Sequence, residues 1–186
     1  HYPADYNIFS LVRTNDKNCL FPDEKIRQEV SDRIGQEFIG TLEQDDIIYT
    51  MLDLEQFIGT RIDWVTGPTF DEVIVRGNKK TGEEYLYLPN VTQRYCTTEL
   101  KVNPIKQWCY ENTNLPVEMR IGFRANEVKR ANSMMNRYRE DGYQWDKFII
   151  GKSKTGLRKR YKEMAYRVCT FPLIRDNSYK DQIEYY

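Results

Sequence analysis

The fold is decided by the stretch Tyr6-Asn7-Ile8-Phe9-Ser10-Leu11-Val12, a short apolar run that is typical of a buried strand. From Pro22 to about Ile34 the sequence predicts a helix, because an early proline and carboxylates favour a helix start. A second strand is predicted from Phe38 to Leu42. A strand, a helix and a strand at this spacing form a βαβ unit, the building block of a parallel sheet. We therefore predict an α/β fold: a three-layer, mostly parallel sheet with helices on both faces.

The remaining predicted elements complete a single domain over 1–186, which is the domain count that this length favours. Further helices are expected over 45–58, 69–74, 98–110 and 126–138, and further strands over 117–123 and 165–171. Thr69 is the expected N-cap of the helix over 69–74. Breaks or loops are expected over 64–68, 76–84 and 144–161, the last of them mobile, and a final helix is expected to begin near Asn177.

The charge balance limits the classes of partner. The 28 basic and 28 acidic residues cancel, which argues against a protein that coats nucleic acid, since such proteins carry a strong basic excess. Anion recognition must therefore be local. The densest basic stretch, Lys152 to Lys162, permits a loop that closes over phosphates and also a solvated loop, and charge runs of this kind favour the solvated loop.

Cysteine and histidine usage argues against several kinds of site. The four cysteines, Cys19, Cys96, Cys109 and Cys169, include no CxxC pair, which argues against a zinc ribbon or an iron–sulfur site and favours reduced thiols in the cytoplasm. His1 is the only histidine, so the sequence predicts no Ser-His-Asp or Cys-His arrangement, no histidine-based zinc catalysis and no metal site. No apolar run approaches the roughly 18 residues that a membrane span needs.

The first candidate site is the run Arg94-Tyr95-Cys96-Thr97-Thr98-Glu99-Leu100-Lys101-Val102-Asn103-Pro104-Ile105. Thr97 or Thr98 is expected to cap a helix whose first N–H groups face the same space as Arg94. Lys101 follows one turn along the same face. A helix start and a forked cation together favour binding of phosphate or sulfate.

The second candidate site is the run Met119-Arg120-Ile121-Gly122-Phe123-Arg124-Ala125-Asn126-Glu127-Val128-Lys129-Arg130. A strand is expected to end at Gly122, which permits close approach of a ligand to the backbone, and Arg124 follows at its carboxyl end. Glu127 is expected either to lock Arg124 or Arg130 by an ion pair or to accept a hydrogen bond from a ribose. This edge of a parallel sheet is where ligands of such folds bind.

Each run also has an ordinary interpretation. In the first, Arg94 pairs with a surface carboxylate, Lys101 is solvated and Cys96 is a small core residue. In the second, a strand is followed by an ordinary charged helix. Taken alone, each run favours the ordinary interpretation, but two such clusters in equivalent positions favour two walls of one pocket for phosphate or sulfate.

Together, the runs resemble motifs of the phosphoadenosine phosphosulfate (PAPS) reductase family, within the adenine nucleotide alpha-hydrolase-like superfamily. The first run is similar to the family pattern R-[WY]-C-T-x-x-L-K-[IV]-x-P and the second to G-[IVF]-R-A-[DN]-E-x-x-R. Thr14 and Phe21-Pro22 resemble the end of the family's second strand and its helix opening. Phe171-Pro172-Leu173 and Asp181 look like the family's Y-P-L segment and the helix after it.

The same resemblance predicts parts that these residues do not contain. The family's pyrophosphate-binding loop, of the type S-G-G-K-D-S, would lie just upstream of His1, and a nucleophilic cysteine in a Glu-Cys-Gly-like tail would follow Tyr186. Cys96 does not match that nucleophile. We therefore expect a chain truncated at both ends, and the catalytic residue stays unknown at this point.

What the resemblance implies is an adenine nucleotide, PAPS or ATP, across the carboxyl ends of the strands, with Thr14 near the adenosine. The residues expected to bind the nucleotide, phosphate or sulfate are Thr14, Arg94, Cys96, Thr97, Lys101, Gly122, Arg124, Glu127 and Arg130. In a reductase, a cysteine thiolate attacks the sulfonate sulfur, and a thioredoxin-like protein supplies electrons. The resemblance thus implies an oxidoreductase of cytoplasmic sulfur metabolism, and it also allows a homo-oligomer.

Two alternatives stay open at this point. In an ATP pyrophosphatase, a transferase-like reaction uses ATP and Mg²⁺ to adenylate an acceptor. The outcome is transfer of sulfur or modification of a nucleic acid, and in the second case the nucleic acid is a partner of the protein. In the other alternative, the domain is a non-catalytic nucleotide-binding or interaction module. The residues quoted above are binding residues, so they do not choose between these functions.

Overall fold

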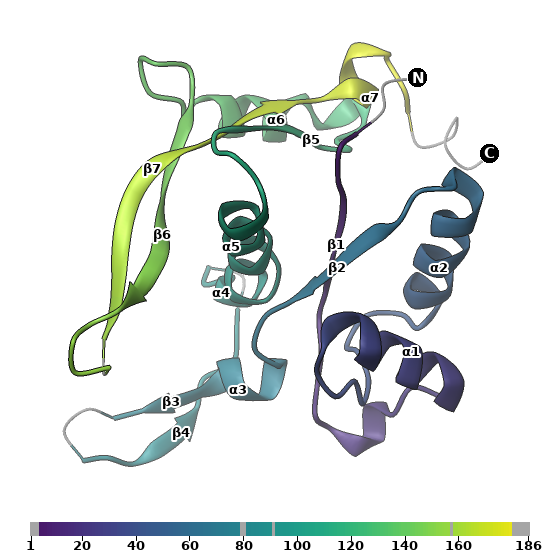
Figure 1. Cartoon of the computed structure of the whole chain (residues 1–186), viewed down its shortest axis with the longest axis vertical. Helices are drawn as coiled ribbons and strands as arrows, with labels where there is room; N and C mark the ends of the chain where they lie inside the picture. Colours follow the sequence, from purple (N-terminus) through teal and green to yellow (C-terminus); the bar gives the residue numbers. More distant parts are fainter. Residues whose placement is uncertain (1–3, 79–80, 91, 157, 180–186) are drawn as a thin grey trace. The chain divides into compact units, whose positions relative to one another are not determined.

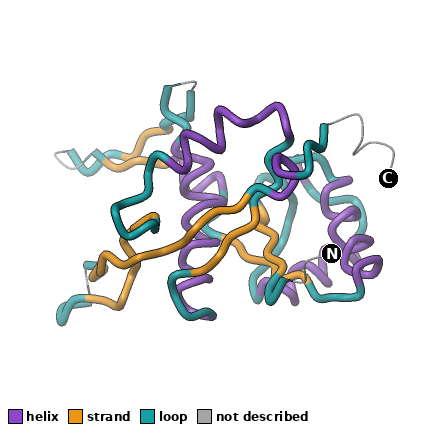
Figure 2. Tube along the Cα trace, turned by 90° about the horizontal axis from the view of Figure 1, so that it is seen from above, coloured by secondary structure: helices purple, strands orange, loops and turns teal. Residues whose placement is uncertain are grey.

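A computed structural model describes residues 4–78, 81–90, 92–156 and 158–179 (Figure 1). The chain divides into two compact units, His1–Ile105 and Lys106–Tyr186, where the sequence predicts one domain. Helices and short strands are mixed along the whole trace (Figure 2).

Unit 1 is built around two parallel strands. Strand β1 (Asn7–Leu11) confirms the first predicted strand, and it pairs in parallel with β2 (Ile62–Thr66). Between them the chain forms α1 (Glu24–Ile34) and α2 (Asp46–Ile58), both of which were expected as helices. The core of this unit consists of fully or nearly buried apolar side chains: Leu11, Phe21, Val30, Phe38, Ile48, Ile62 and Trp64.

The prediction of a strand from Phe38 to Leu42 is wrong. The partner of β1 is β2, which overlaps the segment 64–68 where a break in regular structure was expected. Residues 37–39 have no regular structure, and Gly40 forms only an isolated bridge with Thr14. An added Cβ on Gly40 would lie 1.7 Å from the carbonyl oxygen of Cys19, so the backbones approach too closely for any side chain. Phe38 is apolar because it packs in the core, not because it belongs to a sheet.

Helix ends in unit 1 follow local capping rules. The Asp23 carboxylate accepts hydrogen bonds from the N–H groups of Lys25 and Ile26 at the start of α1. Gly59 ends α2 in the left-handed conformation, with φ of 63°. Helix α3 (Phe70–Ile74) begins at Thr69, as expected, and Thr69 forms a reciprocal capping box with the residue three positions later.

The first candidate run forms one helix in three parts, α4 (Tyr95–Thr97), a π-helical turn η2 (Thr98–Val102) and α5 (Asn103–Asn112). The predicted cap is wrong. Thr97 and Thr98 both have right-handed helical dihedrals inside the helix, and Arg94 occupies the N-cap position without a side-chain capping bond.

Pro104 accounts for the π turn. A proline has no N–H to donate to the carbonyl four residues earlier, which here belongs to Leu100. Instead, the Ser10 hydroxyl on β1 donates to the Leu100 carbonyl at 3.3 Å, and the N–H of Asn103 reaches back five residues to Thr98. The helix therefore continues through the proline, where the sequence predicted an end and a restart.

A small antiparallel hairpin replaces part of the loop expected over 76–84. It consists of β3 (Val75–Gly77) and β4 (Glu84–Leu86), with Arg76 opposite Tyr85. The Arg76 guanidinium lies 4.8 Å from the ring centre of Tyr95, which in turn stacks on Tyr87.

Unit 2 holds a three-stranded sheet in the order β5-β7-β6. Strand β5 (Val117–Arg120) is parallel to β7 (Lys159–Thr170), as expected of two strands in the predicted sheet, whereas β6 (Gln144–Lys152) is antiparallel to β7. The mobile loop expected over 144–161 is wrong, because these residues belong mostly to the long β6–β7 hairpin. The strand expected over 165–171 is confirmed, but it begins at Lys159.

Short helices complete unit 2. A 3₁₀ turn, η3 (Ala125–Glu127), leads into α6 (Val128–Met135), in agreement with the helix expected over 126–138. Helix α7 (Pro172–Arg175) follows β7. Residues 177–179 are not helical, and Asn177 has a φ of 53°. The rest of the last predicted helix, with Asp181, lies outside the described residues.

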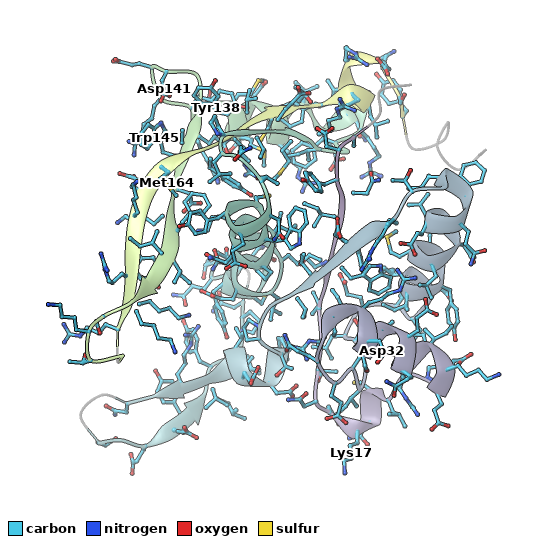
Figure 3. All side chains as sticks on the ribbon, in the orientation of Figure 1. Lys17, Asp32, Tyr138, Asp141, Trp145 and Met164 are labelled. Carbon is cyan, nitrogen blue, oxygen red and sulfur yellow. The ribbon has the colours of Figure 1, made fainter. Side chains whose placement is uncertain are left out.

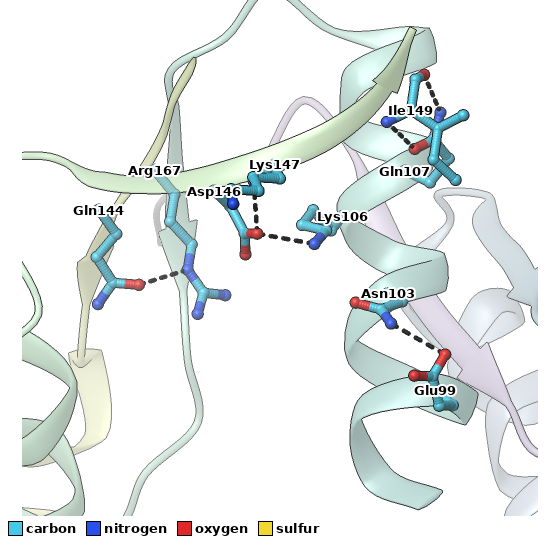
Figure 4. A network of polar contacts seen from close by, with 9 residues as sticks. All are labelled: Glu99, Asn103, Lys106, Gln107, Gln144, Asp146, Lys147, Ile149 and Arg167. Carbon is cyan, nitrogen blue, oxygen red and sulfur yellow. Dashed lines mark hydrogen bonds and ion pairs between the residues drawn. The ribbon is translucent and has the colours of Figure 1, made fainter. Parts of the chain in front are cut away.

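Helix α5 anchors the β6–β7 hairpin at its base (Figure 4). Lys106 forms an ion pair with Asp146 at 2.8 Å, and the side-chain amide of Gln107 exchanges two hydrogen bonds with the backbone of Ile149. Phe148, on the same strand, is completely buried, and its ring centre lies 5.4 Å from that of Tyr110.

The α/β class is confirmed, with helices and both kinds of strand pairing. Within the described residues the sheets are small: two of two strands and one of three, with mixed parallel and antiparallel pairs. These sheets do not by themselves make the predicted three-layer, mostly parallel sheet. No helix in the described part of the chain combines the length and apolar character of a membrane span.

Candidate anion-binding site

The second candidate run turns away from the sheet at the carboxyl end of β5. The N–H of Ile121 donates to the carbonyl of Thr170 at 2.9 Å, which continues the parallel pairing by one residue. Strand β7 ends at the same edge, because parallel strands have their carboxyl ends together. The residues that follow both strands therefore lie at the edge where ligands of parallel sheets bind.

Glu127 is the centre of this segment. Its Oε2 atom accepts hydrogen bonds from the backbone N–H of Arg124 at 3.0 Å and from the Arg124 Nε at 3.2 Å, while Oε1 pairs with Nη1 of Arg130. The Arg124 N–H and then the Arg130 guanidinium lower the pKa of Glu127 to about 2, outweighing the effect of partial burial. The carboxylate is therefore ionised at neutral pH and fixes both guanidinium groups.

Two stacked phenylalanines support Arg130. The Arg130 guanidinium lies 4.4 Å from the ring centre of Phe123. Phe123 in turn stacks on Phe171, with ring centres 5.5 Å apart and planes inclined by 5°. We call Phe123, Arg124, Glu127, Arg130 and Phe171 the Glu127 cluster.

Both cations of the Glu127 cluster remain open to solvent. The side chains of Arg124 and Arg130 are 37% and 64% exposed, against 15% for Glu127. Two guanidinium groups and one carboxylate leave one net positive charge and several N–H donors that Glu127 does not occupy. Held in place and partly solvated, this arrangement suits a small oxyanion.

Gly122 precedes the cluster, and packing in this structure does not require a glycine at that position. An added Cβ would meet only the Leu173 side chain, at the ordinary contact distance of 4.0 Å. Its expected role, close approach of a ligand to the backbone, stays a prediction.

In the first run, polar side chains face solvent and apolar side chains pack against a core. Arg94 and Thr97 are exposed, whereas Cys96 is half-buried and its free thiol packs with Tyr95 against the small core formed by Val12, Val73 and Leu100. Lys101 forms an ion pair with Glu43, which the sequence did not indicate. Arg94 is thus the open cation of this run.

Thr14 follows β1 and is 1% exposed. Its hydroxyl donates to Oδ2 of Asp71 at 2.8 Å, and the Asn15 N–H donates to the same oxygen at 2.6 Å. Burial alone would raise the pKa of Asp71, but these hydrogen bonds lower it below its ordinary value. In this structure Thr14 fixes the loop after β1 to α3, and its contact with an adenosine stays a prediction.

The structure groups the predicted residues by unit. Gly122, Arg124, Glu127 and Arg130 lie together in unit 2, whereas Thr14, Arg94, Cys96, Thr97 and Lys101 belong to unit 1. The pocket with two walls remains a prediction.

Arg13 is a functional candidate that sequence reasoning missed. It lies two residues after β1 and is 6% exposed. Its guanidinium donates to the Thr66 hydroxyl, the Gln36 side chain and the carbonyls of Glu37 and Gly67. Burial lowers the pKa of Arg13, against the opposing effect of a nearby glutamate. An arginine that directly follows a predicted apolar strand is the sequence signal that would have identified it.

Around Arg13 the carboxyl ends of β1 and β2 border an open cleft of about 490 Å³. Its walls are polar and come from Arg13, Asn15, Gln36, Glu37, Thr66, Gly67, Pro68, Thr69 and Glu72. Because Arg13 already has four acceptors, it shapes the cleft more than it offers charge to a ligand.

Comparison of the chain with protein-family models, with curated proteins and with solved structures finds no match in any of the three.

Proposed function

We propose that this chain is the adenine-nucleotide-binding domain of a protein of the PAPS reductase type, which acts on a sulfonucleotide by thiol-dependent reduction in the cytoplasm. The observation that carries the proposal is the Glu127 cluster. Within a run that is similar to a family motif, one carboxylate holds Arg124 and Arg130 side by side at the carboxyl edge of β5.

In this proposal Arg124 and Arg130 bind the phosphate or sulfate of the nucleotide. Charge-assisted hydrogen bonds from a guanidinium to an oxyanion are among the strongest that proteins form. Because Glu127 already fixes both side chains, binding immobilises little that was free before, and less affinity is lost to side-chain ordering. Arg94, which is exposed at the start of α4 in unit 1, is proposed as a further cation that binds phosphate or sulfate.

Ligand binding tests the proposal directly. PAPS at about 100 times its dissociation constant should raise the free energy of unfolding by about 2.7 kcal/mol, which differential scanning fluorimetry detects as a higher melting temperature. Isothermal titration calorimetry then gives the affinity. If neither PAPS nor ATP with Mg²⁺ raises the melting temperature, the nucleotide proposal is wrong.

A matched pair of arginine variants locates the site. Arg124→Ala should weaken binding of the anionic ligand by about 1.5–3 kcal/mol, the scale of a hydrogen bond to a charged group. Arg139→Ala is the control, because Arg139 is also half-exposed, pairs with a glutamate at 2.6 Å and lies over an aromatic ring, but outside the Glu127 cluster. Equal losses for both variants would show that the site lies elsewhere.

Ligand preference separates the proposed reaction from its alternatives. A preference for PAPS over ATP supports the sulfonucleotide, and release of sulfite in the presence of a thioredoxin-like reductant supports reduction. If the protein instead prefers ATP with Mg²⁺ and releases pyrophosphate, it is a pyrophosphatase and the proposal of a reductase is wrong. Nucleotide binding without either product would leave a non-catalytic binding module.

A further inference from the structure

The outer part of the β6–β7 hairpin carries a concentration of positive charge. We call residues 151–156 and 158–162 the hairpin tip; its cations are Lys152, Lys154, Arg158, Lys159, Arg160 and Lys162. Between Asp146 and Glu163 the sequence contains no carboxylate. All six cations are exposed, and none forms an ion pair with another residue that the structure describes.

This charge opposes the pairing of the strands. Lys152 and Lys159 are direct cross-strand partners, and like charges at such positions destabilise a sheet. Nearer the base, by contrast, Lys147 lies opposite Glu163, an arrangement that stabilises the pair. The described part of the chain offers nothing that compensates the charge of the tip, whereas an external polyanion would.

The tip is nonetheless an ordered ribbon. The Gly156 N–H donates to the Ser153 carbonyl at 2.8 Å, and the Ser153 N–H donates to the Arg158 carbonyl at 2.7 Å, which closes the turn. Gly151 has a φ of 140° at an irregularity in the pairing, where the strand bends. The solvated, mobile loop favoured by the sequence is therefore replaced by a shaped projection.

Cations lie on both faces of this ribbon. Successive side chains of a strand point to opposite faces, so Lys159 and Arg160 extend in opposite directions. At the other end of the hairpin are Asp141 and Trp145 (Figure 3), joined by a hydrogen bond of 2.7 Å. The hairpin thus has a positive tip on both faces and its carboxylates at the base, near the anchor on α5.

We propose that the hairpin tip binds the backbone phosphates of double-stranded DNA, with the ribbon directed into the major groove. The major groove of B-form DNA admits a two-stranded β-ribbon, and the phosphates that border it on both sides match cations on both faces. Phosphate contacts carry affinity without sequence preference. The zero net charge of the chain makes this recognition local to the tip. The inference does not depend on the proposed nucleotide site.

Binding of a short fluorescent DNA duplex, followed by anisotropy, tests the inference. The variant carries Lys152→Gln, Lys159→Gln, Arg160→Gln and Lys162→Gln. If each of the four cations contacts a phosphate, the slope of log K against log salt should fall in magnitude by about 3.6. The ratio of wild-type affinity to variant affinity should then shrink by about 100-fold between about 50 and 200 mM salt. An unchanged affinity or slope would overturn the inference.

Two controls separate local from general charge and from misfolding. Lys17→Gln, Lys25→Gln, Arg61→Gln and Arg137→Gln together change the net charge by the same amount at four exposed cations elsewhere, and this variant should bind the duplex as the wild type does. Lys152→Arg with Lys159→Arg and Lys162→Arg keeps the charge and should also retain binding. Equal loss in the first control, or loss in the second, would contradict specific phosphate contacts by the tip.

Two further results would reassign the surface. Binding to vesicles containing phosphatidylserine, without binding to the duplex, would make the tip a membrane contact. Displacement of the duplex by PAPS or ATP, together with loss of duplex binding in Arg124→Ala, would put the DNA on the Glu127 cluster. Duplex binding that survives Arg124→Ala supports the tip, even if no mononucleotide binds.

Discussion

The Glu127 cluster and the hairpin tip are both cationic, but they hold their charge in opposite ways. In the cluster, one carboxylate fixes two guanidinium groups and an aromatic pair supports one of them. In the tip, six cations have no ion-pair partner among the described residues.

The difference teaches how each region can select an anion. Fixed donors around a single carboxylate suit one small oxyanion whose shape matches them. Unpaired, flexible cations spread along a ribbon suit a polyanion, whose affinity arises mainly from counterion release. The following predictions test this contrast.

The largest effect is expected from the anchor that makes the tip a ribbon. Phe148 is fully buried against Tyr110 and Tyr166, so Phe148→Ala should lower the free energy of unfolding by about 3–5 kcal/mol, as measured by urea denaturation. Tyr161→Ala, on the same hairpin but 57% exposed, is the control and should change stability by less than about 0.5 kcal/mol. Similar losses for both would mean that the hairpin is not anchored through its base.

Salt should distinguish the two cationic regions. Between about 50 and 200 mM salt, four phosphate contacts at the tip predict a decrease in duplex affinity of about 100-fold. Binding of a single nucleotide at the Glu127 cluster should decrease by a smaller factor, because it involves fewer contacts. Anisotropy for the duplex and calorimetry for the nucleotide, in the same buffers, give both slopes. Equal dependence of both affinities on salt would show that the two regions do not bind their anions in different ways.

Acid should reduce the contribution of the Glu127 cluster to the free energy of unfolding and leave that of the hairpin tip unchanged. The folded-state pKa of Glu127, about 2, lies below its ordinary value of 4.5, so its contribution to stability is fully present above pH 4.5 and is lost as the pH falls toward 2. The stability difference between wild type and Glu127→Gln should therefore shrink over this window in pH-dependent denaturation. Lys152→Gln should leave the profile in that window as it is. A constant difference for Glu127→Gln would show that its ion pairs do not form in solution.

The smallest effect concerns the like-charge pair in the tip. Lys152→Glu places a carboxylate opposite Lys159 and should raise the free energy of unfolding by about 0.2–1 kcal/mol, while it weakens duplex binding. Lys147→Glu does the reverse at the base, where it puts two carboxylates opposite each other, and should destabilise the hairpin by a similar amount. Thermal unfolding and anisotropy on both variants would show whether stability and DNA affinity move in opposite directions.

Much of unit 1 follows from local rules. Asp23, Thr69 and Gly59 mark helix ends where the sequence expects them, because a capping bond joins residues only two or three positions apart. The strand at Ile62–Thr66 was missed because its evidence is not local: it pairs with β1 across two helices. Phe38 shows the converse, since burial in the core gives a segment the apolar character of a strand without a partner.

For the candidate site, the sequence indicated the residues but not their arrangement. It left open whether Glu127 locks Arg124, locks Arg130 or binds a ligand, and the structure has it engage both arginines. Thr97 and Thr98 were expected to cap a helix that in fact begins earlier, where Tyr95 and Cys96 pack against the small core of Val12, Val73 and Leu100.

By itself the sequence determined the α/β class, the capped helices, the local balance of charge and the two basic runs, because each depends on neighbours along the chain. Only the tertiary structure decided that Ser10 satisfies the carbonyl left open by Pro104, that Glu127 gathers two arginines, and that residues 144–161 form a ribbon instead of a loop. These outcomes depend on partners distant in sequence, whose pairing satisfies backbone groups that no local pattern can assign.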